Sequence, residues 1–336
     1  MESKIDPNDV RFFSGRSHPD LAERITGILG VTLESTTFTR FSNDNLFIQL
    51  GASVRGREVY IIQSLTTPVS EHLMELFMML DIARSAGASA VHAVIPYYSY
   101  ARSDKKNAPR ISITARLIAD LLQTAGATHV MTMTLHSPQV HGFFSIPTDP
   151  LTARNLFVNH LRERANRLGT PYLQDETVVV APDYGRAGSA ARLGDQLGLK
   201  AISAEKSRVS DTRVEIDELI KEQARRFRRA IIYDDEIATG GSVVTLSNML
   251  VESGIQEILI VCTHGLFIGN ALEEITAIPQ VKEIITTDTV SINPDVKAQY
   301  PNLTILSIAP LIAEAIWKNY NRQSIGSLFS YGPDED

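Results

Sequence analysis

The segment AIIYDDEIATGGS, Ala230–Ser242, carries the strongest structural signal in the sequence. Its apolar run predicts a buried strand that ends in two carboxylates, Asp234 and Asp235. Small residues then predict a turn, and a helical stretch follows from Val243. Backbone amides in such a turn can surround a phosphate, and the helix N-terminus adds partial positive charge. The segment therefore predicts a phosphate site, with an ordinary strand–turn–helix corner as the alternative.

Similar apolar runs elsewhere in the chain predict further buried strands. Together with Ala230–Tyr233 of the segment above, the predicted strands are Val59–Ile62, Val91–Ile95, Thr177–Val180 and Ile258–Cys262. Runs without polar alternation are typical of parallel strands that are covered on both faces. Because these runs alternate with helical stretches, we expect an α/β fold with doubly wound parallel sheets. Ligands should bind at the carboxyl ends of the strands.

Three helical stretches end at a glycine and lead into a β-branched run. The glycines are Gly87, Gly126 and Gly254, in RSAGASAVHAVIPY, QTAGATHVMTM and VESGIQEILIVCTH. Glycine readily adopts the left-handed conformation that commonly ends a helix. The first two helices also have apolar stripes that predict core packing. These stripes are Leu73, Leu76, Phe77 and Leu80, and Leu117, Ile118, Leu121 and Leu122.

The length of 336 residues predicts two domains. We place the boundary between Ala153 and Arg154, because the charged helical stretch Asn155–Arg167 follows it. The first domain is then residues 1–153 and the second is residues 154–336, with the last helix expected to pack back on the first domain. Two of the helix–glycine–strand units precede this boundary and one follows it, which suggests two similar domains.

The composition excludes several classes of protein. With 43% hydrophobic and 21% charged residues, the chain can form a substantial globular core. Its net charge of −7 disfavours a general nucleic-acid or anionic-membrane binder. The single cysteine, Cys262, excludes an intramolecular disulfide and multi-cysteine metal sites. We expect a cytoplasmic protein, because the N-terminus has no signal-peptide core and no apolar stretch could span a bilayer.

The phosphate-loop segment resembles the phosphoribosyl diphosphate loop of the type I phosphoribosyltransferase fold. From Phe13 to Phe329 the chain also resembles the ribose-phosphate diphosphokinase (phosphoribosyl diphosphate synthetase) family. The matching motifs include FFSGRSHPDLAERI, RFSNDNLFIQL, SEHLMELFMMLDIAR, IPYYSYARSDKK, LHSPQVHGFF, PDYGRAG, EKSR and LIAEAIWKN. The resemblance implies two similar domains of that fold. It also implies that the anomeric hydroxyl of ribose 5-phosphate attacks the β-phosphorus of MgATP, so that AMP leaves.

The resemblance assigns roles to residues by their positions in these motifs. It implies ribose 5-phosphate binding by Asp234, Asp235, Ala238, Thr239, Gly240, Gly241 and Ser242. It implies ATP binding by Phe41, Asn43, Asp44, Asn45, Arg102 and Ser103. Lys206 and Arg208 are the implied catalytic cations, and His136 and Asp183 are the implied contacts of Mg²⁺. The implied assembly is a dimer-based homo-oligomer, commonly a hexamer, whose subunits complete each other's sites.

The sequence departs from the family pattern near these sites. Thr134 stands where the family usually has the metal-site aspartate, which removes a negative charge beside the cation. Asn43-Asp44-Asn45 replaces Asp-Gly-Glu in the segment that reaches ATP across a subunit interface. Asp44 therefore stands at a glycine position, where it could alter the turn. Arg186 interrupts a usual Gly-Gly pair.

Three functions remain open on these residues. We favour an active, divergent synthetase, because the implied catalytic cations, the acid pair and the phosphate loop are all present. A catalytically silent homologue that binds and regulates an active synthetase is the second, supported by Thr134 and by the altered Asn43–Asn45 segment. A phosphoribosyltransferase is the third, but such a single-domain enzyme would lack the first half of the chain. No P-loop, HExxH or GxSxG motif occurs, so the sequence gives no support to a P-loop kinase, a zinc protease or an α/β-hydrolase.

Overall fold

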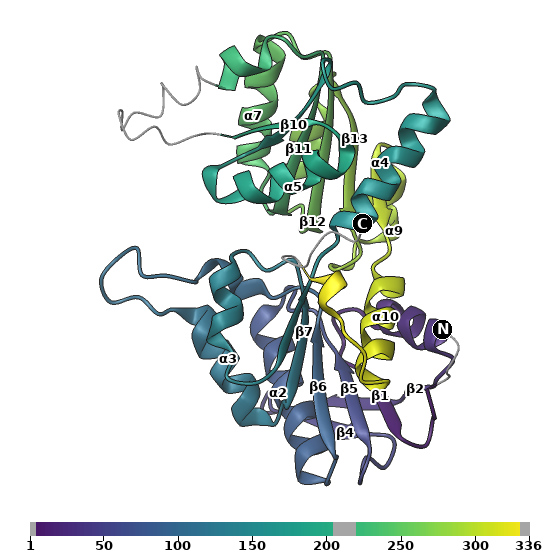
Figure 1. Ribbon diagram of the computed structural model, residues 1–336. Coiled ribbons are helices and arrows are strands. Elements are labelled where there is room, and N and C mark those ends of the chain that lie inside the picture. The colour runs from purple at the N-terminus through teal and green to yellow at the C-terminus, as the bar shows by residue number, and fades with distance from the viewer. Residues whose placement is uncertain (1–4, 204–219, 330–336) are drawn as a thin grey trace. The chain divides into compact units, whose positions relative to one another are not determined.

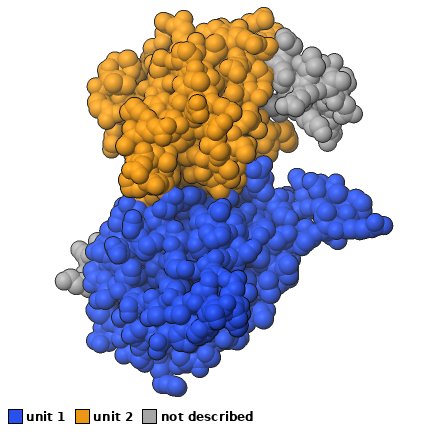
Figure 2. All heavy atoms as spheres, turned by 180° about the vertical axis from the view of Figure 1, so that it is seen from behind, with its two compact units in different colours: residues 1–152, 289–291, 307–336 blue, residues 153–288, 292–306 orange. Residues whose placement is uncertain are grey.

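The computed structural model describes residues 5–203 and 220–329. The chain divides into two compact units, coloured separately in Figure 2. Unit 1 comprises residues 1–152, 289–291 and 307–336, and unit 2 comprises residues 153–288 and 292–306. Each unit is built on its own six-stranded sheet (Figure 1). In residues 5–203 and 220–329, no helix combines the length and the apolarity needed to cross a bilayer.

Unit 1 contains a fully parallel sheet in the order β2-β1-β5-β6-β7-β8. Its strands are β1 (Val10–Ser14), β2 (Leu33–Glu34), β5 (Glu58–Ile62), β6 (Ala90–Ile95), β7 (His129–Met133) and β8 (Thr148–Leu151). Its α-helices are α1 (Pro19–Leu29), α2 (Val69–Ser85), α3 (Thr114–Ala125) and α10 (Ala309–Tyr320). Helices α2 and α3 pack against each other, as do α1 and α10. Figure 1 shows these two pairs on opposite faces of the sheet, which makes it doubly wound.

Unit 2 repeats the same topology, because its parallel sheet has the order β10-β9-β11-β12-β13-β14. Its strands are β9 (Thr177–Ala181), β10 (Lys200–Ser203), β11 (Arg229–Ile237), β12 (Glu257–Gly265), β13 (Val281–Thr287) and β14 (Leu303–Leu306). Its α-helices are α4 (Arg154–Leu168), α5 (Ala187–Leu197), α7 (Gly241–Glu252), α8 (Ala271–Thr276) and α9 (Pro294–Gln299). Two similar doubly wound parallel sheets confirm the predicted fold class.

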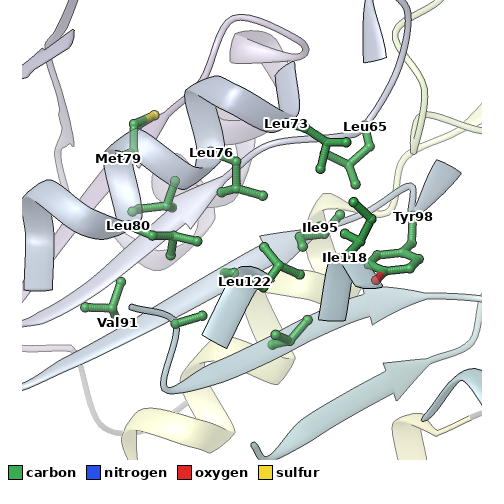
Figure 3. Close-up of a cluster of buried hydrophobic side chains, with 14 of the residues drawn as sticks. Leu65, Leu73, Leu76, Met79, Leu80, Val91, Ile95, Tyr98, Ile118 and Leu122 are labelled. Atoms are coloured by element: carbon green, nitrogen blue, oxygen red, sulfur yellow. The ribbon is translucent and has the colours of Figure 1, made fainter. Parts of the chain in front are cut away.

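The core of unit 1 follows the predicted apolar stripes only in part. Leu73, Leu76 and Leu80 of α2 are buried against the sheet, as predicted (Figure 3). On α3, however, Leu117 and Leu121 are exposed, while their neighbours Ile118 and Leu122 are buried. The prediction for α3 was therefore wrong for two of four positions. Only one side of that apolar stripe faces the sheet, although the spacing of all four residues fits a helix face.

Two elements differ from the sequence expectation in ways that affect the sites. Strand β11 continues to Ile237, because its pairing with β12 extends to Ile237 opposite Gly265. Asp234 and Asp235 therefore lie within the strand rather than after it. Unit 1 also contains an antiparallel hairpin, β3 (Thr36–Arg40) and β4 (Leu46–Leu50), which packs on α2. The apolar runs had predicted only parallel strands.

Candidate functional site

Each sheet has one point where the strand order reverses. In unit 2 this point lies between β9 and β11, and in unit 1 it lies between β1 and β5. Parallel sheets bind ligands outside the carboxyl ends of the strands at such switch points. The segments that follow these four strands are therefore candidates for a ligand-binding site.

The predicted phosphate loop lies at the switch point of unit 2. Residues Ala238–Gly240 connect β11 to the first turn of α7, where Thr239, Gly241 and Ser242 are exposed. Gly240 precedes the helix with a φ of 78°, and a Cβ there would lie 3.3 Å from side-chain atoms of the packed helix α8. Glycine accepts this conformation without strain, and a side chain here would also have to displace α8 by a few tenths of an ångström. The first N–H groups of α7 have no partners within the helix, so they can bind an anion.

The two carboxylates of β11 share a buried arginine. Arg186 Nη2 lies 3.2 Å from Asp235 Oδ2, and Arg186 Nε lies 4.0 Å from Asp234 Oδ1. The backbone N–H of Asp235 also donates to Asp234 Oδ1 at 2.8 Å. Burial, together with the negative charge of Asp235, raises the pKa of Asp234 to about 8. The departure noted at Arg186 therefore places a counter-ion at the acid pair.

Asp183 lies at the same switch point, directly after β9. The residue is exposed, and its Oδ1 accepts the backbone N–H of Arg186 at 3.1 Å, which caps the short 3-10 helix Tyr184–Arg186. The structure thus brings together Asp183, the acid pair and the phosphate loop. His136, the other predicted metal contact, belongs to unit 1.

The predicted nucleotide residues of unit 1 follow two neighbouring strands. Arg102 is exposed at the end of the 3-10 helix Ser99–Arg102, which comes after β6. His136 is half-buried after β7. Because β6 and β7 are adjacent and parallel, both residues lie at the carboxyl edge of this sheet. The Ser103 hydroxyl is used within its own loop, since it donates to the carbonyl of Ser112 at 3.3 Å and accepts the N–H of Thr114 at 3.2 Å.

The predicted adenine-contacting residues form the tip of the β3–β4 hairpin. The Phe41 N–H donates to the Asn45 carbonyl at 2.9 Å, and the Asp44 N–H donates to the Phe41 carbonyl at 2.9 Å. The Phe41 side chain is 52% exposed, so one face of its ring is available for stacking. Asp44 has a φ of 69°, in the left-handed region that favours glycine. Asp44 therefore adopts, at the position where the resemblance implies a glycine, a conformation that glycine accepts at less cost.

Thr134 also adopts a left-handed conformation, two residues before His136. Its φ is 42°, and its N–H donates to the Leu151 carbonyl at 2.8 Å. For a β-branched residue this region is an outlier and indicates local backbone strain. The strain lies directly beside a predicted metal contact, and threonine stands there in place of an aspartate, which tolerates the conformation better.

Thr134→Asp should therefore raise the free energy of unfolding of unit 1. We expect a gain of about 1 kcal/mol, the lower end of the range that backbone strain of this kind costs. Denaturant unfolding can be followed by the fluorescence of Trp317, the single tryptophan of the chain, which lies in α10 of unit 1. Thr134→Val is the matched control, because valine keeps the branched Cβ and should give no gain. An aspartate variant no more stable than the valine variant would show that the backbone at this position is unstrained.

Lys206 and Arg208, the predicted catalytic cations, lie outside the described residues. Sequence reasoning also missed one feature of the sites that the structure reveals. Arg16, which follows β1 at the switch point of unit 1, pairs with Glu75 of α2. The two residues are 59 positions apart, so no local pattern links them.

Two family models match the chain. The N-terminal domain of ribose phosphate pyrophosphokinase matches residues 10–126, and the phosphoribosyl synthetase-associated domain matches residues 220–330. A putative ribose-phosphate pyrophosphokinase of Streptomyces coelicolor is 47% identical over 97% of this chain and 99% of its own length. The ribose-phosphate pyrophosphokinase of Deinococcus radiodurans is 41% identical over 98% of this chain and 100% of its own. The crystal structure of phosphoribosylpyrophosphate synthetase from Mycobacterium smegmatis superimposes with a TM-score of 0.82 and 34% identity, over 94% of this chain and 99% of that one.

Proposed function

The chain belongs to the ribose-phosphate pyrophosphokinase family, and from this premise we propose that it makes 5-phosphoribosyl 1-diphosphate. It transfers the diphosphoryl group of ATP to the anomeric hydroxyl of ribose 5-phosphate and releases AMP. The observation that carries this proposal is similarity to such enzymes across both units, including 47% identity over 97% of the chain. A phosphoribosyltransferase would account for one unit only. No finding favours a silent regulatory homologue.

Unit 2 would bind the sugar phosphate. The loop Ala238–Ser242 and the N-terminus of α7 offer backbone N–H groups and partial positive charge to the 5-phosphate. Asp234 and Asp235, at the same end of the sheet, can accept hydrogen bonds from the sugar hydroxyls. Together these contacts would orient the anomeric hydroxyl. A correctly oriented hydroxyl lowers the entropic cost of its attack on the β-phosphorus of ATP.

Unit 1 would bind the nucleotide. Phe41 presents a half-exposed ring for stacking on adenine, and the side chains of Asn43, Asp44 and Asn45 supply hydrogen-bonding groups beside it. Arg102, exposed at the carboxyl edge of the sheet, suits a phosphate group. Ser103 supports the Arg102 segment, because its hydroxyl fastens the following loop.

The residues fit a magnesium ion that is held mainly by substrate. Within residues 5–203 and 220–329, no cluster of three or more His, Cys, Asp or Glu side chains could hold a cation. Mg²⁺ is commonly bound by one or two carboxylates, waters and substrate phosphates. Within unit 2, Asp183 would supply a carboxylate oxygen. Within unit 1, His136 would act beside the phosphate oxygens of the nucleotide or through water. When bound, Mg²⁺ would neutralise charge that develops on the transferred diphosphate.

Lys206 and Arg208 would stabilise the transferring group, as the resemblance implies. Diphosphoryl transfer depends on positioning and on neutralisation of charge rather than on a covalent enzyme intermediate. We also propose a dimer-based homo-oligomer in which the Phe41–Asn45 segment contacts nucleotide bound mainly by a neighbouring subunit. A cytoplasmic location, where ATP and sugar phosphates are available, is part of the same proposal.

The purified protein should form AMP only when ATP, ribose 5-phosphate and a divalent cation are all present. A coupled assay for AMP, with each component omitted in turn, measures this directly. The omission of ribose 5-phosphate is the essential control, because an ATP diphosphohydrolase would still release AMP. A folded protein that forms no AMP with any cation would contradict the proposal and favour the silent homologue.

A further inference from the structure

A series of charged side chains of alternating sign links the core of unit 1 to the tip of the β3–β4 hairpin. We call it the acid–arginine chain, and it consists of Glu75, Arg16, Glu71, Arg40 and Asp44. Its members come from three segments: the residues after β1, the first turns of α2, and the hairpin. It lies at the carboxyl edge of the sheet, because Arg16 follows β1 and α2 begins seven residues after β5 ends.

The inner end of the chain is rigid. Glu75 is fully buried, and its carboxylate accepts the Nε–H of Arg16 at 2.6 Å, the backbone N–H of Arg16 at 3.3 Å and the amide of Gln63 at 2.9 Å. A buried carboxylate with an ion pair and several hydrogen bonds has little freedom to move. The neighbouring Gly15 has no room for a side chain, since a Cβ there would lie 2.2 Å from the Gln63 oxygen.

The switch point of unit 1 is therefore filled by its own side chains, whereas that of unit 2 carries the glycine-rich loop. Arg16, Gln63 and Glu75 occupy the region between β1 and β5, where a parallel sheet would bind a ligand. This position in unit 1 is therefore better suited to hold a neighbouring element of the fold in place than to bind a substrate.

The element it fixes is the hairpin. Arg16 pairs with Glu71 as well as Glu75, and its guanidinium carbon lies 5.4 Å from the ring centre of Phe38 in β3. Glu71 in turn pairs with Arg40 Nη2 at 2.7 Å, and Arg40 Nη1 reaches Asp44 Oδ1 at 2.5 Å. The side-chain hydrogen bond from Arg40 lowers the pKa of Glu71, so this carboxylate is ionised at neutral pH.

The base of the hairpin packs on the core of unit 1 through the buried Ile48, whereas residues 41–45 at its tip are all exposed and gain little from burial. A single exposed ion pair would contribute little to its stability. Here, however, the buried Glu75 holds the Arg16 side chain in place. Arg16 in turn orients the Glu71 carboxylate, so that Glu71 is already positioned to pair with Arg40. Each outer pair therefore loses less side-chain freedom on forming than an independent surface pair would.

We propose that the acid–arginine chain holds the Phe41–Asn45 segment in its nucleotide-binding position before the nucleotide arrives. Arg16, Glu71 and Arg40 are positioning residues in this account, and they set the affinity for ATP rather than the rate of diphosphoryl transfer. The choice of ATP as the ligand rests on the proposed function. The positioning of the hairpin stands on contacts within unit 1 alone.

The test compares Glu71→Gln with Asp81→Asn. Glu71→Gln removes the central charge from the chain at an accessible position, so folding should persist. Asp81→Asn is the matched control, because Asp81 is another acid of α2 that pairs with an arginine, but its partner at 2.7 Å is Arg84 of the same helix and not an arginine of the hairpin. We expect faster amide hydrogen exchange over residues 36–50 in the free Glu71→Gln enzyme only. We also expect its KM for ATP to rise about tenfold, as loss of one charged hydrogen bond predicts, with kcat nearly unchanged.

Salt provides an independent arm of the experiment. At about 1 M salt the screening length falls to about 3 Å, so exchange over residues 36–50 should accelerate in the wild type and much less in Glu71→Gln. Equal exchange and equal KM values in the Glu71→Gln and Asp81→Asn variants would overturn the inference. If the wild-type enzyme turned over no substrate, the proposed function would fail. The exchange comparison would still decide whether the chain holds the hairpin.

Discussion

Lys206→Ala should lower kcat by about 100- to 1000-fold while leaving the folded protein intact. Removal of one group that stabilises transition-state charge commonly has an effect of this size. The KM values should change much less, because the lysine is expected to act as charge develops and not when the substrates bind. Steady-state kinetics with both substrates, together with thermal unfolding of the variant, would measure the two effects separately.

Lys200→Ala is a suitable control for this variant. Lys200 is an exposed lysine at the start of β10, only six residues earlier in the chain, and no catalytic role is assigned to it. It should keep near-normal turnover. If Lys206→Ala also kept normal turnover, the assignment of the catalytic cations by resemblance would be wrong.

Asp235→Asn should reduce both the stability of unit 2 and its affinity for ribose 5-phosphate. The substitution replaces the nearer carboxylate partner of the buried Arg186 by a neutral amide. Complete loss of a buried pair costs about 3 kcal/mol, and we expect a smaller loss here because Asp234, 4.0 Å from Arg186 Nε, remains as a second carboxylate. The substitution also removes the charged acceptor that we propose for a sugar hydroxyl, which should raise the KM for ribose 5-phosphate at least about tenfold. Calorimetry and steady-state kinetics measure these two losses.

A double variant separates the structural effect from the binding effect. Arg186→Met combined with Asp235→Asn removes both charges and fills a similar volume, so it should recover much of the lost stability. It should not recover affinity for the sugar phosphate. Recovery of both would mean that Asp235 serves the fold alone, and recovery of neither would mean that the two side chains are not coupled.

The sequence predicted the scaffold well because the relevant signals are local. Continuous apolar runs identified β5, β6, β9, β11 and β12, and the three helix-ending glycines all adopt positive φ, as expected. The end of β11 could not be predicted, because it depends on how far β12 extends beside it. The exposed half of the α3 stripe could not be predicted either, since burial depends on which side of the helix packs against α2 and the core.

The site was predictable where a motif is contiguous. The loop Ala238–Ser242 and the acid pair lie in one segment, and the structure places both at the switch point of unit 2. The roles of Arg186 and Arg16 depend instead on partners 48 or more positions away, which only the folded sheets bring close. Arg186 was noticed as a departure from the family, but its pairing with Asp235 could not be inferred from that. The functional assignments of the site residues stay predictions.

The most direct test of the central claim is to identify which phosphorus atom of ATP is attacked. Phosphorus NMR of the purified protein with ribose 5-phosphate, ATP and Mg²⁺ follows substrates and products together. Attack at the β-phosphorus predicts equal amounts of AMP and a new sugar diphosphate, whose two coupled signals appear as those of ATP decline. Formation of ADP with a sugar bisphosphate, or of AMP with free diphosphate and unchanged ribose 5-phosphate, would contradict the account.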